Sequence, residues 1–233
     1  MSMRWLLWKD YRHNRLVVFT ALALLLAPHL VALYAICRAK FLGLADVSEW
    51  PRSLAMSSMA SLIICQLAFA LIGGNAIAGE RVNRSSEFLF SLPITRRRLL
   101  ASKLLLALGI AAFIWSIDAS ILWYGVKTAR SSGIRLGENR LFDQMLTDVA
   151  VTGLTFFCVA WFLSSFLSSP AYAACAGLVA PLFVAGGISF VDRQFELHID
   201  DTTAELWWRG ICLTLAPPCF VVGTWHYLRR VEP

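Results

Sequence analysis

The sequence predicts an all-α integral membrane protein with six transmembrane helices and both termini in the cytoplasm. Of its 233 residues, 58% are hydrophobic and 15% are charged, whereas soluble domains usually carry about 25% charged residues. Apolar runs of about 20 residues, long enough to cross a hydrocarbon core of about 30 Å, recur along the chain. Leucine- and alanine-rich runs such as ALALLLA (21–27) lack the alternation of membrane β-barrel strands, so we expect helices.

Six apolar runs have the length of a membrane span, and we expect them to form a single permease domain over residues 1–233. The first run is not expected to be a cleaved signal peptide, because its charged leader is 15 residues long and no small-x-small cleavage site follows it. The six runs are roughly Leu16–Cys37, Ala55–Ala78, Leu99–Val126, Val149–Leu167, Ala171–Val191 and Trp207–Trp225.

Lysine and arginine are enriched on the side of the membrane where this layout places the termini. The connections on that side hold 12 basic residues and the opposite connections hold 9, and such an excess marks the cytoplasmic side. We therefore expect a protein of the cytoplasmic (inner) membrane, with both termini and the polar segment 79–103 in the cytoplasm. The acidic segment 192–206 should be extracytoplasmic, either as short helices that dip toward the membrane or as a solvated loop.

The polar segment GERVNRSSEFLFSLPITRRRLLASK (79–103) places eight charged residues between two apolar spans. Ser85 or Ser86 can cap a short helix that Pro93 ends. The next helix then has Arg96–Arg98 in its first turn, where cations oppose the helix dipole. Lipid headgroups, topology or an acidic partner must favour these arginines. A purely topogenic loop would account for the arginines but not for the remainder of the segment.

Several motifs together resemble the permeases of type-2 ATP-binding cassette (ABC) transporters. They are an acidic–basic pair that closes the second span, an acid shortly before SLPITR, and a lysine that opens the third span. The leader WLLWKDYRHNR (5–15) resembles that family's interfacial leader, so residues 1–15 should form an interfacial segment. The resemblance implies that 79–103 is a coupling segment that docks on an ATPase. Its interface residues would be Glu80, Arg81, Arg84, Glu87, Phe88, Leu92, Pro93, Ile94, Thr95 and Arg96.

The resemblance also implies the partners. Separate ATP-binding cassette ATPase subunits would hold ATP and Mg²⁺, and a second permease copy or a related permease would complete the pathway in the lipid bilayer. The chain itself has no phosphate-binding loop, because in GNAIAGER (74–81) Glu80 and Arg81 replace the required Lys and Ser/Thr. We expect no cofactor, no metal and no nucleic-acid partner for this chain. No H-E-x-x-H or G-x-S-x-G motif is present, so we do not expect an enzyme.

Three polar residues inside the spans are candidates for a pathway or for helix packing. Asp118 lies about 24 Å along the third span, which favours solvation at the outer interface over a position on a substrate path. His29 follows Pro28, which removes a helical hydrogen bond, and it should bond a freed carbonyl rather than a ligand. Asn75, beside two glycines, should bond across a helix interface.

These features predict the membrane-spanning permease subunit of an ABC transporter, and the resemblance implies an exporter. The alternative is an ATP-independent membrane carrier or a scaffold subunit of a membrane complex. A carrier would be expected to pair charged residues at mid-membrane, and we identify no such pair in the sequence.

Overall fold

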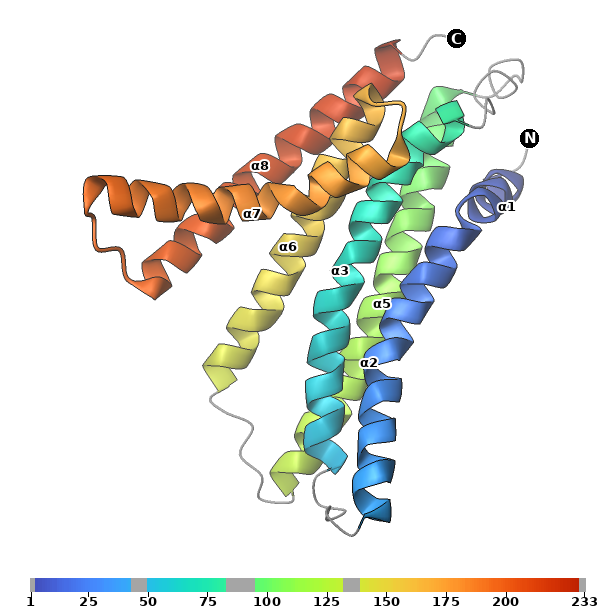
Figure 1. Cartoon of the computed structure of the whole chain (residues 1–233). Coiled ribbons are helices and arrows are strands. Elements are labelled where there is room, and N and C mark those ends of the chain that lie inside the picture. The colour runs from blue at the N-terminus through green and yellow to red at the C-terminus, as the bar shows by residue number, and fades with distance from the viewer. Residues whose placement is uncertain (1–2, 43–49, 83–94, 132–138, 231–233) are drawn as a thin grey trace.

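The computed structural model describes residues 3–42, 50–82, 95–131 and 139–230, and within these ranges it is a bundle of helices without strands (Figure 1). The predicted all-α class is confirmed. The helices are α1 (Met3–His13), α2 (Arg15–Phe41), α3 (Trp50–Val82), α5 (Arg96–Ser131), α6 (Asn139–Phe166), α7 (Pro170–Phe195) and α8 (Asp201–Arg230).

Six helices, α2 to α8, are long and apolar enough to cross a membrane, which confirms the six predicted spans. Except at the end of α6, which stops at Phe166, they extend beyond the predicted edges, because charged residues at the ends of the apolar runs continue the helices. The 33 residues of α3, for example, rise about 50 Å. Glu80 and Arg81 therefore belong to the last turns of α3.

The end of the bundle that carries α1 is called here the α1 end. The last turns of α3, α6 and α8 and the first turn of α5 also lie there (Figure 1). The two ends of the described chain thus lie at the same end of the bundle, as the predicted topology requires. The segment 83–94 lies outside the described residues.

Helix α3 is the centre of the bundle and packs against α2, α5, α6 and α7. Small residues allow these contacts, as expected for helix packing in a membrane. A Cβ atom on Gly73 would lie 2.6 Å from the carbonyl oxygen of Phe157 in α6. At the separate contact between α7 and α6, a Cβ atom on Gly177 of α7 would lie 2.7 Å from Cβ of Ala160 in α6. Both glycines are therefore positions where two helices approach closely.

Helix α7 crosses the bundle at a wide angle and leads into α8 (Figure 1). Within the segment 192–206, only residues 196–200 are not helical, and the rest belongs to α7 and α8. Asp200 precedes α8, and its carboxylate accepts hydrogen bonds from the backbone amide and the hydroxyl of Thr203 at 3.3 and 2.6 Å. Hydrogen bonds to Thr202 and Thr203 lower the pKa of Asp200 to about 2. Asp200 therefore caps α8 as an anion at the positive end of the helix dipole.

The close approach of α3 and α6 gives a testable prediction. Gly73→Ala should lower the melting temperature of the detergent-purified protein, because the new Cβ meets backbone that cannot rotate away; overpacking costs about 1–3 kcal/mol. Gly109→Ala in α5 is the matched control, since a Cβ atom there meets nothing within 4 Å. Equal melting temperatures for the two variants would contradict the close helix contact.

Candidate functional site

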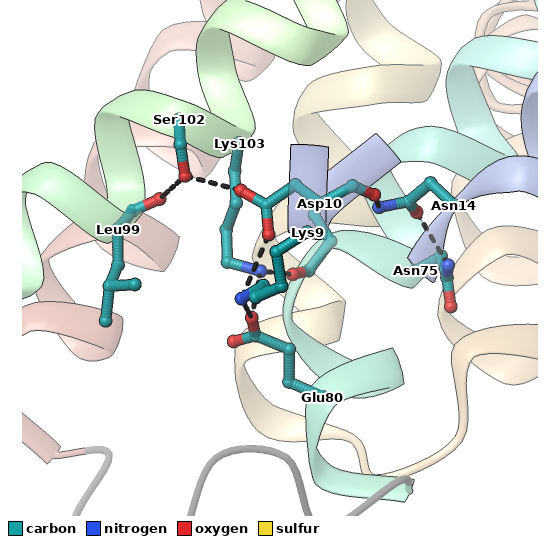
Figure 2. A network of polar contacts seen from close by, with 9 residues as sticks. Lys9, Asp10, Asn14, Asn75, Glu80, Leu99, Ser102 and Lys103 are labelled. Carbon is teal, nitrogen blue, oxygen red and sulfur yellow. Dashed lines mark hydrogen bonds and ion pairs between the residues drawn. The ribbon is translucent and has the colours of Figure 1, made fainter. Parts of the chain in front are cut away.

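Glu80 is the centre of a buried charge network at the α1 end (Figure 2). Its side chain lies near the end of α3 and is only 6% exposed. The Nζ atom of Lys9 in α1 donates to Glu80 Oε1 at 2.8 Å, and the Nζ atom of Lys103 in α5 lies 3.0 Å from the same oxygen. A single carboxylate on α3 therefore binds both α1 and α5.

A second carboxylate completes the network and balances its charge. Asp10 in α1 is buried and lies 3.0 Å from the Nζ atom of Lys9. The hydroxyl of Ser102 in α5 contacts the carboxylate of Asp10, and the Nζ atom of Lys103 donates to the carbonyl of Ala76 in α3 at 2.5 Å. Two lysines thus face two acids, as burial of charge in an apolar bundle requires. We define this set as the Glu80 network: Lys9, Asp10, Glu80, Ser102 and Lys103.

Two further polar side chains border the network. Asn75 in α3 donates to the side-chain oxygen of Asn14 at 2.7 Å, where α1 meets α2, so it bonds across a helix interface as expected. The ring of His13 packs so closely on α3 that a Cβ atom on Gly79 would lie 2.8 Å from its Nε2 atom. Burial, and then the charge of Lys103, lower the pKa of His13 below 6.5. His13 therefore stays neutral near pH 7 and adds no third cation to the network.

Arginines on either side of the segment 83–94 bind the ends of two other helices. The Nη2 atom of Arg81 donates to the carbonyl of Ser165 near the end of α6 at 2.6 Å. The Nη1 atom of Arg96 donates to the carbonyl of Leu228 near the end of α8 at 3.1 Å. Carbonyls at a helix C-terminus are the negative end of its dipole and favour cations. The dipole of α5 disfavours a cation in its first turn, and the contact with the end of α8 compensates Arg96 for this.

The other residues of the expected coupling interface are only partly placed. Thr95 directly precedes α5, and its carbonyl accepts the amide of Arg98 at 2.9 Å, which is the geometry of an N-cap. The remaining six residues lie outside the described part of the chain: Arg84, Glu87, Phe88, Leu92, Pro93 and Ile94.

A second buried polar cluster lies inside the spans and corrects two expectations. Asp118 in α5 is fully buried, so its expected solvation at the interface is wrong. Its Oδ2 atom accepts the hydroxyl of Ser61 at 3.0 Å, and its Oδ1 atom lies 3.2 Å from Nε2 of His29. The Nδ1 atom of His29 lies 3.0 Å from the hydroxyl of Ser57. His29 thus pairs with side chains of α3 and α5 rather than with a carbonyl freed by Pro28.

The same cluster pairs two ionisable side chains, His29 and Asp118, that belong to different spans. His29 lies at the middle of α2, and α2 and α5 meet α3 at this level of the bundle. The sequence does not reveal this pair, because its members are 89 positions apart. The residues around each of them do not indicate which neighbouring helix the side chain contacts.

A third polar contact, also missed from the sequence, joins α6 and α8 away from the α1 end. The guanidinium of Arg209 in α8 lies against the carboxylate of Asp148 in α6, with 3.1 Å between Nη2 and Oδ2, and it also contacts Glu205. Such two-pronged arginine–carboxylate contacts are geometrically specific. They hold α8 on α6 at a point remote from the Glu80 network.

Removal of the Glu80 charge should strongly destabilise the protein. Glu80→Gln leaves Asp10 as the only carboxylate of the network opposite the half-buried Lys9 and the buried Lys103, and breaking a buried ion pair from one side costs about 3–5 kcal/mol. The melting temperature of the purified protein should therefore fall. Arg97→Gln, an exposed substitution in the first turn of α5, should leave it unchanged. A Glu80→Gln variant as stable as Arg97→Gln would show that the network does not hold α1 and α5 to α3.

The pairing of His29 with Asp118 predicts non-additive effects of substitution. His29→Leu should destabilise the protein because Asp118 loses a buried partner, whereas His29→Leu with Asp118→Leu should be more stable than His29→Leu alone. This coupling is measured from the melting temperatures of both single variants and the double variant. Ser120→Leu, an exposed substitution on α5, is the control. Strictly additive effects would contradict the pair.

Comparison with known proteins identifies the family. A family model described as "ABC-2 family transporter protein" matches residues 7–192, which include every member of the Glu80 network. Searches among curated proteins and among solved structures gave no significant match. The matched range spans well over half of the chain, with four of its six candidate membrane helices complete and the fifth covered up to residue 192. The chain therefore belongs to the ABC-2 family of transporter membrane proteins.

Proposed function

We propose that the chain is the permease subunit of an ABC exporter and that segment 79–103 couples a separate ATPase to the membrane helices. One observation carries this proposal. The residues on either side of 83–94 lie on α3 and α5 and are bonded to each other and to three further helices: Glu80 to Lys103 of α5 and to α1, Arg81 to α6, and Arg96 to α8. A displacement of the segment therefore acts on most of the bundle through direct polar contacts.

The proposal assigns the chemistry to another chain. ATP and Mg²⁺ are held by the ATPase subunits, which dock on the segment from the cytoplasm, and a second permease copy or a related permease completes the pathway. Both termini then lie in the cytoplasm, since they share the α1 end with the segment. Export as the direction of transport follows from the family resemblance.

A second candidate is an ATP-independent carrier, and the His29–Asp118 pair favours it. An ionisable pair within membrane spans is costly and is commonly functional. Ser57 and Ser61 fill the remaining hydrogen-bonding positions of the pair, however, and these bonds hold α2, α3 and α5 together. The cluster is therefore also explained by helix packing, and the coupling proposal accounts for more of the structure.

Co-purification with the candidate ATPase tests the proposal. Wild-type permease in detergent should retain the ATPase, and Glu87→Arg with Pro93→Gly should lose it while remaining folded and inserted. Glu196→Arg, in the exposed connection between α7 and α8, is the control and should bind like wild type.

Equal ATPase binding by wild type and the double variant would exclude segment 79–103 as the docking site. A different outcome would identify the protein as an ATP-independent carrier. In that case no ATPase binds wild type, and a proton gradient drives substrate transport in proteoliposomes that contain the permease alone.

A further inference from the structure

A cavity of about 480 Å³ lies between α3, α5, α6 and α8 and is separate from the Glu80 network. Helices α5 and α6 both pack against α3, which forms the floor between them. Leu108 of α5 and Leu154 of α6 line the cavity and are 65% and 46% exposed. The cavity is therefore accessible from the side of the bundle, where the spans face lipid.

The lining of the cavity selects for an uncharged, apolar occupant. Four aromatic side chains contribute to it, one from each surrounding helix: Phe69, Trp115, Phe157 and Phe220. None of its lining residues carries a charge. A volume of this size lies within the usual range of about 300–1,000 Å³ for small-molecule sites, which are mostly apolar with a few polar groups that orient the ligand.

Gln66 of α3 supplies one polar group of the cavity, and its hydrogen bonding is incomplete. The residue is 2% exposed, and its Nε2 atom donates to the carbonyl of Leu62 at 2.6 Å. Its Oε1 atom is buried and has no hydrogen-bond partner within the described residues. A buried acceptor without a partner destabilises the fold, because its lost hydration is not replaced. A hydroxyl or N–H group on a ligand would remove this cost.

Gly153 of α6 makes room for this acceptor. A Cβ atom at position 153 would lie 1.9 Å from Gln66 Oε1, so any other residue would displace the amide. Gly153 and Gln66 both line the cavity. The absence of a side chain on α6 thus leaves an unpaired carbonyl oxygen at the wall of an aromatic cavity.

We propose that this cavity binds an uncharged, largely apolar molecule that reaches it from the bilayer and donates one hydrogen bond to Gln66 Oε1. Such a molecule carries a hydroxyl or an amide or amine N–H on an aromatic or aliphatic body. The further statement that the transported substrate belongs to this class of molecules rests on the proposed function. Binding itself does not, and it is measured on the permease without any ATPase.

A matched pair of fluorescent probes tests the site in lipid nanodiscs. N-phenyl-1-naphthylamine has one N–H donor, and its N-methyl derivative has none. Energy transfer from tryptophan to probe should contain a saturable part for wild type. Gln66→Leu should weaken binding of the N–H probe about two- to thirteenfold, as expected for one hydrogen bond of about 0.5–1.5 kcal/mol. The methylated probe should bind both proteins alike.

Two controls keep the test specific. Gln144→Leu, an exposed glutamine-to-leucine change on α6, should leave binding of both probes unchanged. Ala111→Phe, which fills the cavity from α5, should abolish saturable transfer at an unchanged melting temperature. No saturable transfer in wild type, or an equal response of both probes to Gln66→Leu, would overturn the proposal and leave the cavity to lipid acyl chains. Either result is independent of whether an ATPase co-purifies.

Discussion

The arrangement of the α1 end depends on one buried carboxylate, that of Glu80. An ion moved from water into an apolar bundle loses several kcal/mol of solvation unless opposite charges and hydrogen bonds replace the water. Glu80 recovers this loss from two lysines on two different helices. The requirement to neutralise one charge therefore fixes where α1 and α5 lie relative to α3. Asp10 and Ser102 extend the same network and bring α1 against α5 a second time.

The helix dipoles extend this arrangement to the rest of the bundle. The side chains of Arg81 in α3 and Arg96 in α5 reach across to other helices. They donate to carbonyls at the C-terminal ends of α6 and α8. Their charges are stabilised where the dipoles of those two helices are negative. The described ends of segment 79–103 are thus bonded to each other and to α1, α6 and α8. These contacts support the proposed mechanical role of the segment over a topogenic one, since topology alone does not require partners on α6 and α8.

The sequence predicts the helices well and their contacts poorly. Apolar length is a property of a single run, so all six spans could be identified, with edges placed too far inside because charged helix ends were excluded. Lys103 and Glu80 could be singled out by their resemblance to family motifs, but not as a pair. Lys9 and Glu80 are 71 positions apart, and no local pattern shows that two such residues meet.

The same limit applies inside the spans. Asp118 was assigned to the interface from its depth alone, whereas its environment is set by His29 and Ser61 on neighbouring helices. The cavity beside Gln66 likewise depends on which helices surround it. For both the His29–Asp118 cluster and the Gln66 cavity, the sequence indicates only that a polar residue lies within an apolar run. Its partner became apparent only once the helices were packed.

Hydrogen–deuterium exchange of a complex with the candidate ATPase tests most directly whether Glu80 transmits movement from the segment. Exchange would be compared with and without ATP, in wild type and in Glu80→Gln, by mass spectrometry of peptides from 83–94 and from α1. ATP should change exchange in both regions of wild type, and in Glu80→Gln only in 83–94. An ATP-dependent change in α1 that persists in Glu80→Gln would contradict the account, because the movement would then reach α1 by another route.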